Sequence, residues 1–564
     1  MSAKLKPRLV TGFGVFVVSL LLRVRHFSSL GLTQFDEGVY AISGFWSQVS
    51  PHSHPLYPWQ RYFAPPGYFG LIGIAYWLAG GASDLAAIAP NLLLGAATPV
   101  LVWWIGERWF GRSCGLFAAL LAATSEFNIV FSRTALADTA FTFFFLLSLA
   151  LIAFYFESGN VGIGIAAGLS VGATWNFKYH GWMPLAIAAL ALFFDSIRHR
   201  SVSRIRTLVL PWALVSIVAV VCFLPWLIYV NSLPGGYLAV ERFHSQFVDF
   251  HWKADFVRQA QMVLWFDGWL SRLSPAACFL IAIVLSKERN AIRSPSVLWG
   301  FLALLVSGIS IGGGGTAALL AIPGSVIAWR SRTLLGMMVV LTFAVLTLVT
   351  PFYTPYARLL LPWIASSQFL AGISIGTYVR SESSGREYPQ RWIGIPFPVE
   401  AGGFIALSVV LMAVCGASIP AETRAWRSSS MTRIAAQEIM HHLPSNAFLA
   451  VDQEPALAFY FRRAGLATVC VNQLAQIQAP AGAPIVLIAG QYARQTPDWN
   501  PVVRAEGYEL QRAGGIAVLP SEVQLLDDLA PREAREFLTH PDGRYIVEAY
   551  RMIPSAHRDR TGQR

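Results

Sequence analysis

Residues 9–27, LVTGFGVFVVSLLLRVRHF, decide the fold class of this chain. The stretch is almost wholly apolar and is long enough to cross a hydrocarbon core of about 30 Å. It follows a tail with Lys and Arg and has no small-residue cleavage site, so we interpret it as a retained first span rather than a signal peptide. The whole chain is 55% hydrophobic and only 13% charged, unlike ordinary soluble domains. A polytopic α-helical membrane protein is therefore predicted.

Apolar runs of similar length recur along the chain and predict about 13 transmembrane helices. Basic residues gather in alternate loops between them, and the positive-inside rule places those loops and the N-terminus in the cytoplasm. The net charge of +11 therefore does not indicate a nucleic-acid partner. The five cysteines are far apart and show no disulfide framework or zinc-ligand spacing. The spans are expected near residues 9–27, 84–105, 114–130, 139–156, 161–175, 182–195, 207–230, 270–286, 296–312, 315–329, 333–350, 358–376 and 401–420.

Two domains are expected, with residues 1–420 forming the transmembrane domain and carrying outer loops at 28–83 and 231–269. Residues 67–81 are apolar but short, which favours a helix at the membrane interface. Residues 421–564 have the composition of a soluble α/β domain, and an odd number of spans places this domain on the non-cytoplasmic side. Its predicted helices are TRIAAQEIMHHL (432–443) and APREAREFL (530–538), and its predicted strands are NAFLAVD (446–452), APIVLIAG (483–490) and GGIAVLPS (514–521).

Three carboxylates on the outer side, close to predicted spans, are candidate site residues. Asp36 and Glu37 lie in GLTQFDEGVY, about ten residues beyond the first span. They are either a solvated or helix-capping pair, or a general base for an acceptor hydroxyl or amine at the mouth of a membrane groove. Asp138 immediately precedes the span at 139–156 and can cap that helix or act as a second active-site group. The sequence leaves these alternatives open.

Cationic side chains stand near the membrane in every outer loop. Each can simply extend its charge to the interface, but basic residues are disfavoured on this side, and Arg and Lys bind phosphate well. We therefore expect a substrate with a phosphate head and an apolar body, such as a polyprenyl phosphate. The candidate substrate-binding residues are Arg23, Arg25, Arg61, Tyr68, Arg133, Asp138, Lys178, His180, Tyr356 and Arg358. His52 and His54 could bind a divalent metal with the carboxylates, or be ordinary loop residues.

The order of these motifs resembles the GT-C-type membrane glycosyltransferases, among them the protein O-mannosyltransferases and the aminoarabinose transferases that act on lipid A. The resemblance covers about residues 10–375. It rests on DEGVY after the first span, APPGYF in the same loop, SRTALAD, a Lys after the fifth span, and YARLLLP before the twelfth. It implies a sugar donor carried on an undecaprenyl-phosphate-type lipid and an acceptor reached from the periplasmic face of a bacterial inner membrane. The acceptor can be a lipid, a polysaccharide or a protein.

The resemblance also implies roles for individual residues. Asp36 would be the catalytic base and Glu37 would orient its neighbours. Either Arg23 or Arg25 would correspond to the family's basic residue at the end of the first span. Arg133, Lys178 and Arg358 would lie near the carrier phosphate. The chain departs from the family in RLLLP, where the Arg is normally followed by Tyr, so an aromatic contact is missing or is supplied by Tyr356.

Inverting sugar transfer is the expected activity. The alternatives are a transporter or flippase of a lipid-linked sugar and an oligosaccharyltransferase-like enzyme, which would need a divalent metal. The transporter is disfavoured because the ionisable groups gather at one membrane face and because the sequence shows no internal repeat.

Overall fold

The computed structural model describes two compact units, which are treated separately. The first unit comprises residues 1–25, 91–132 and 137–426, and the second comprises residues 26–90, 133–136 and 427–564. The second unit therefore joins the predicted outer loop 28–83 to the C-terminal segment, a grouping that the sequence did not indicate. The described residues are 5–47, 56–199, 202–248, 250–285, 295–380, 430–474, 479, 482–490, 507–518 and 545–554.

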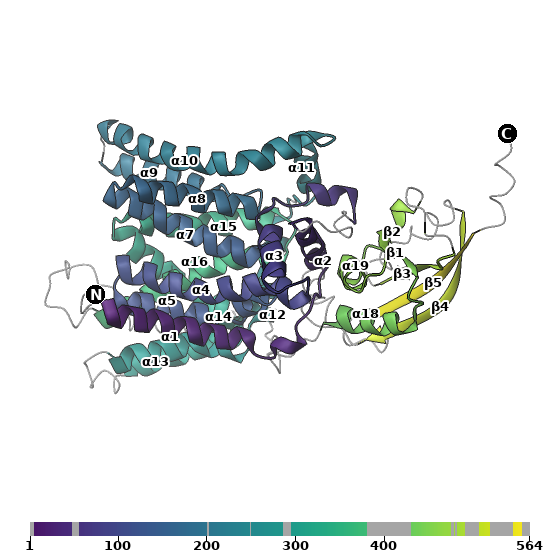
Figure 1. Cartoon of the computed structure of the whole chain (residues 1–564). Helices are drawn as coiled ribbons and strands as arrows, with labels where there is room; N and C mark the ends of the chain where they lie inside the picture. The colour runs from purple at the N-terminus through teal and green to yellow at the C-terminus, as the bar shows by residue number, and fades with distance from the viewer. Residues whose placement is uncertain are drawn as a thin grey trace. The chain divides into compact units, whose positions relative to one another are not determined.

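The first unit is helical (Figure 1). Helices α7, α8 and α10 lie side by side, and α5, α13, α14 and α16 pack around a core that includes Phe117, Phe279 and Leu320. The helices are α1 Leu5–Val24, α4 Asp84–Trp109 (from residue 91), α5 Arg112–Thr124, α6 Glu126–Ser132, α7 Ala137–Ser158, α8 Val161–Phe177, α9 Met183–His199, α10 Val202–Asn231, α11 Gly236–Ser245, α12 Trp252–Phe266, α13 Trp269–Leu285, α14 Pro295–Arg330, α15 Leu334–Val349 and α16 Leu361–Arg380.

Every predicted span that falls in the described residues overlaps one of these helices. Six helices in the described part of the chain are long and apolar enough to cross a membrane, or seven if the bent pair α5 and α6 is one broken span. The chain is therefore a multi-pass membrane protein, whereas the total of 13 spans stays a prediction. The span predicted at 401–420 lies outside the described residues.

The glycine run at 312–315 interrupts α14. Gly312 has φ 78° and ψ 167°, which is not helical, and the hydroxyl oxygens of Ser307 and Thr316 lie only 3.0 Å apart. In a straight helix these two residues would be separated by about 13 Å along the axis. The chain therefore folds back at Gly312, which lies at the junction of the spans predicted at 296–312 and 315–329.

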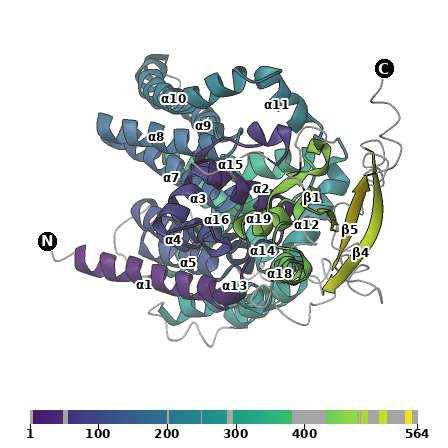
Figure 2. The ribbon, with the colours of Figure 1, turned by 45° about the vertical axis from the view of Figure 1, so that its right-hand side comes forward.

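The second unit contains a five-stranded mixed sheet in the order β2-β1-β3-β5-β4. β1 pairs in parallel with β2 and β3, whereas β5 is antiparallel to β3 and β4, and β4 and β5 form a long edge pair (Figure 2). β1, β3 and β4 overlap predicted strands and α18 coincides with a predicted helix, while 530–538 lies outside the described residues. The bounds are α18 Met431–His442, β1 Phe448–Asp452, α19 Pro455–Arg463, β2 Thr468–Cys470, β3 Ile485–Ala489, β4 Tyr508–Val518 and β5 Tyr545–Pro554.

Two helices of the outer loop complete the second unit. α2, Phe35–Ser43, packs on α19, and α3 is the predicted interfacial helix. α3, Gly67–Leu78, has twelve residues and is too short to span a bilayer core of about 30 Å. Its side chains Trp77 and Leu78 are exposed, as suits a helix lying at an interface. Short 3-10 turns lie at Phe27–Ser29, Gly44–Ser47 and Pro58–Arg61.

Candidate active site

Glu37 is locked in place at the first turn of α2. Its side chain is 0% exposed. One carboxylate oxygen accepts hydrogen bonds from the Thr33 amide (2.7 Å), the Thr33 hydroxyl (2.9 Å) and the Gln34 amide (2.9 Å). The other accepts from the Ala135 amide at 2.7 Å. Burial raises the pKa of the Glu37 carboxyl, and the hydrogen bonds from Ala135, Thr33 and Gln34 act in the opposite direction.

Asp36 is the preceding residue on the same turn, but its environment differs. It is half-buried, whereas Glu37 beside it is fully enclosed. Because Glu37 ties α2 to Ala135, it fixes both the turn that carries Asp36 and the connection between α6 and α7, which carries Arg133. Glu37 is therefore placed to orient its neighbours, and Asp36 is the less buried member of the pair.

The other candidates of the second unit differ in exposure. Arg133 is buried, and burial lowers its pKa to about 10, so it remains protonated at neutral pH. Arg61 is exposed. Tyr68 is fully buried, with its hydroxyl donating to the Ala87 carbonyl at 3.3 Å and its ring edge-on to Tyr40. We assign Tyr68 to the packing of α3 rather than to substrate contact.

In the first unit, Lys178 and Asp138 form a close ion pair. The ammonium nitrogen lies 2.5 Å from Asp138 Oδ1, and both side chains are largely removed from solvent. Asp138 is the second residue of α7, inside the helix and not at the N-cap position that the capping interpretation requires, and its Oδ1 pairs with Lys178. His180 follows in the same connection, with its ring edge-on to Phe141 at 4.9 Å. The pair fixes the lysine at the end of α8.

The two arginines at the end of α1 differ in exposure. Arg23 is 1% exposed and donates to the carbonyl and hydroxyl of Ser19, at 3.0 and 2.6 Å. A side chain at Gly95 would meet the Arg23 guanidinium and Ser132, so both approach α4 closely there. Arg25 is exposed. Arg23 is therefore the arginine that faces the interior of the bundle.

Tyr356 and Arg358 lie together in the connection before α16. The Arg358 guanidinium stands over the Tyr356 ring, 4.9 Å from its centre, which is a cation–π arrangement. Tyr356 is therefore an aromatic residue in direct contact with Arg358 in this connection. The connection is held by loop 231–269, because the Thr354 amide donates to the Phe247 carbonyl at 2.7 Å.

Sequence reasoning missed the aromatic group beside Lys178. The Tyr179 ring lies edge-on to His244 at 5.3 Å, and its hydroxyl accepts from the Trp226 indole at 3.3 Å. Loop 231–269 was recognised from the sequence, but no spacing singled out His244. Its approach to Tyr179 depends on how α11 folds over the end of α8. Among the described residues, no three His, Cys, Asp or Glu side chains form a metal-binding group; His52 and His54 lie outside them.

Comparisons with known proteins agree on the fold. Residues 64–229 match the family dolichyl-phosphate-mannose-protein mannosyltransferase. The structure is similar to ArnT from Cupriavidus metallidurans bound to undecaprenyl phosphate, with a TM-score of 0.52 and 16% identity, over 97% of this chain and 98% of that chain. The chain has the GT-C fold. The resemblance expected from the sequence is confirmed at this level.

The GT-C fold is also seen in a second match. The archaeal oligosaccharyltransferase AglB from Archaeoglobus fulgidus, in complex with an inhibitory peptide and a dolichol-phosphate, has a TM-score of 0.50 and 12% identity, over 91% of this chain and 73% of that chain. No curated protein matches the chain in sequence. The family match at 64–229 includes Arg133, Asp138 and Lys178 of this GT-C chain, whereas Asp36 and Arg358 lie beyond its ends.

Proposed function

We propose that this GT-C protein transfers a single sugar from an undecaprenyl-phosphate-type donor to an acceptor at the periplasmic face of a bacterial inner membrane. The observation that carries the proposal is the fold, which matches ArnT bound to undecaprenyl phosphate along nearly the whole chain. The distribution of basic residues among the loops supports a cytoplasmic N-terminus, with the carboxylate-bearing loops on the opposite face. The acceptor is a lipid, a polysaccharide or a protein with a free hydroxyl or amine.

Asp36 is the proposed catalytic base. It takes the proton of the acceptor group while the acceptor atom forms a bond to the anomeric carbon of the donor sugar. The bond between that carbon and the phosphate oxygen breaks at the same time, and the polyprenyl phosphate leaves with the electron pair. The transition state resembles an oxocarbenium ion, and attack opposite the leaving group inverts the anomeric configuration.

Glu37 is proposed as a positioning residue. Four hydrogen bonds already occupy its two carboxylate oxygens, so a proton taken from the acceptor would have to displace one of them. Asp36 is half-buried and stands on the same helical turn. These differences support distinct roles, in which Asp36 reacts and Glu37 fixes the first turn of α2.

The leaving phosphate needs positive charge more than a proton. We propose that this positive charge comes from Arg133, Lys178 and Arg358. The surroundings of each side chain limit its motion. Asp138 holds Lys178 through the ion pair, and Tyr356 supports Arg358. Arg23 is proposed to contribute from the end of α1. The assignment of these residues to one reaction rests on the order of the sequence motifs.

The experiment that tests the function is sugar transfer in detergent. Wild-type protein is offered a panel of radiolabelled polyprenyl-phosphate sugars, with cell-envelope extract as the acceptor source and with or without divalent metal. Label moving into the extract, with an inverted anomeric linkage in the product, is expected. Donor binding without turnover for any acceptor would favour a transporter or flippase, and strict dependence on a divalent metal and a sequon peptide would favour an oligosaccharyltransferase-like enzyme.

A further inference from the structure

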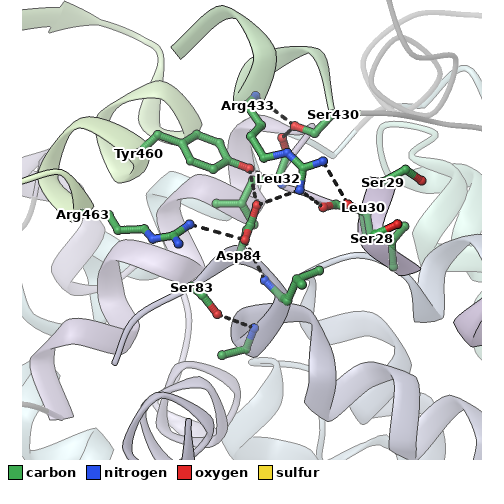
Figure 3. A network of polar contacts seen from close by, with 12 residues as sticks. Ser28, Ser29, Leu30, Leu32, Ser83, Asp84, Ser430, Arg433, Tyr460 and Arg463 are labelled. Atoms are coloured by element: carbon green, nitrogen blue, oxygen red, sulfur yellow. Dashed lines mark hydrogen bonds and ion pairs between the residues drawn. The ribbon is translucent and has the colours of Figure 1, made fainter. Parts of the chain in front are cut away.

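Asp84 is the centre of a polar network in the second unit (Figure 3). It begins α4 at the end of loop 28–83, and it is 4% exposed. Its carboxylate accepts from the Tyr460 hydroxyl at 3.1 Å. The guanidinium groups of Arg433 and Arg463 lie 3.5 and 3.6 Å from its two oxygens. All three partners come from α18 and α19 of the C-terminal segment.

The same C-terminal side chains bind the beginning of the loop. The Tyr460 hydroxyl accepts from the Leu32 amide at 2.9 Å. Arg433 donates to the carbonyls of Leu30 and Ser28, at 2.7 and 3.1 Å. The hydroxyl of Ser430 donates to the Leu32 carbonyl at 2.5 Å. Tyr460 and Arg433 each therefore bridge the two ends of the loop that carries Asp36.

We propose that Arg433 and Tyr460 form a clamp that closes loop 28–83 at its base and positions α2 with Asp36. The clamp consists of Asp84, Arg433 and Tyr460. Its effect on catalysis rests on the proposed function, whereas its effect on the loop does not. Arg433 and Tyr460 are positioning residues, because they act through α2 and not on the substrate.

Close packing between the loop and the C-terminal segment supports this role. A Cβ at Gly31 would lie 2.7 Å from Ser430 Cβ and 2.8 Å from the Tyr460 hydroxyl, so the loop and the C-terminal segment would have to shift to admit a side chain there. A side chain at Gly38 in α2 would lie 2.1 Å from the backbone nitrogen of Ala456. The C-terminal segment therefore fixes the loop both before α2 and within it.

The chemistry of the clamp depends on the residue types. The Tyr460 hydroxyl must donate to Asp84 and accept from Leu32 at once, and burial together with the charge of Asp84 raises its pKa, so the proton is kept. A guanidinium has several donors in a fixed plane, so Arg433 can reach two carbonyls and a carboxylate together. Phenylalanine and glutamine keep much of the bulk of these residues but break the bridges.

The test uses full-length Tyr460→Phe and Arg433→Gln in detergent, with Arg512→Gln as the matched control. Arg512 in β4 pairs with Glu548 in β5 at 3.1 Å, in the same C-terminal segment, and is not a member of the clamp. We expect amide exchange in residues 28–43 to speed up about tenfold in the two clamp variants, as for loss of one or two buried hydrogen bonds. Exchange in α7 and α8 should stay unchanged, and Arg512→Gln should behave as wild type.

The catalytic readout separates positioning from folding. In the clamp variants kcat should fall about tenfold with the donor KM unchanged, and Asp84→Glu should retain more activity than Asp84→Asn. Exchange that is unaltered in 28–43, or faster throughout the chain, would overturn the clamp. If wild-type protein transfers no sugar, the proposed function fails, but exchange in residues 28–43 still decides whether the clamp exists.

Discussion

At the residue scale, Asp36 and Glu37 show how two adjacent carboxylates come to lie in different environments. The sequence predicts the pair and its place beyond the first span. It does not predict which member is enclosed, because that depends on the Ala135 amide, 98 residues away along the chain. Glu37 accepts four hydrogen bonds and is a structural anchor, whereas Asp36 is the half-buried residue that we propose as the base.

Glu37→Gln should therefore destabilise the protein more than Asp36→Asn does. Glutamine has one acceptor oxygen in place of two, so buried donors at Ala135 or at Thr33 and Gln34 lose their partner, at a cost of about 1–3 kcal/mol. Asp36→Asn leaves the four hydrogen bonds of Glu37 in place and should therefore lower thermal stability less. Thermal unfolding of both variants in detergent measures the difference. Equal destabilisation by the two substitutions would contradict the division of roles.

Asp452, at the end of β1, gives a pH-dependent prediction. Its side chain is 7% exposed, burial raises its pKa from 3.8 to about 6, and Oδ2 has no hydrogen-bond partner in the described structure. The folded state therefore binds a proton more tightly than the unfolded state. This contribution is fully present below about pH 4 and is lost as pH rises to about 6, which lowers the free energy of unfolding by about 3 kcal/mol.

Asp452→Asn should remove this dependence. The variant should unfold at a higher temperature than wild type at pH 8 and at nearly the same temperature at pH 4. Thermal unfolding of both proteins at the two pH values measures this difference in unfolding temperature. A variant that is less stable than wild type at pH 8 would show that the charged carboxylate is stabilised in the folded state.

At the element scale, apolar runs predicted the helices well because a bilayer forces each span to satisfy its own backbone. The breaks within them were harder to predict. The chain bends by 59° between α5 and α6, and nothing in the local sequence except Ser125 marks the place. In the C-terminal segment, β5 was missed because it carries Glu548 and Arg551 and only Val547 and Met552 are buried among residues 546–554, so it lacks a clear apolar pattern.

The contact of α2 with α19 is testable at a single glycine. A Cβ at Gly38 would overlap the backbone of Pro455 and Ala456, and backbone cannot move aside as a flexible side chain can. Gly38→Ala should therefore lower stability by about 2 kcal/mol or more and reduce sugar transfer. Gly70→Ala in α3 is the matched control, since nothing lies within 4 Å of its added methyl group. Comparable stability of the two variants would mean that α2 does not pack on α19 as described.

At the scale of the whole molecule, the sequence predicted a multi-pass GT-C protein but not its division into compact units. Composition changes near residue 421, which suggested a boundary there. The structure instead groups loop 28–83 with the C-terminal segment, through contacts such as Asp84 with Tyr460 that are 376 residues apart in sequence. Such pairings leave no local pattern, because the partners are ordinary polar residues.

The predicted orientation can be tested by truncated fusions to a reporter that is active only outside the cytoplasm. Gly111 lies between Arg108 and Arg112, and the positive-inside rule keeps that turn in the cytoplasm. Gly235 lies in loop 231–269, on the opposite face. A fusion after Gly235 should be active and one after Gly111 inactive. The reverse pattern would invert the proposed membrane orientation and place Asp36 in the cytoplasm.

The most direct test of the central claim is the turnover rate of Asp36→Asn with the labelled donor and acceptor that wild type uses. Loss of a general base costs about 10²- to 10⁴-fold, so kcat should fall within that range while donor binding stays at the wild-type value. A variant that turns over at the wild-type rate would show that Asp36 is not the base and would contradict the mechanism.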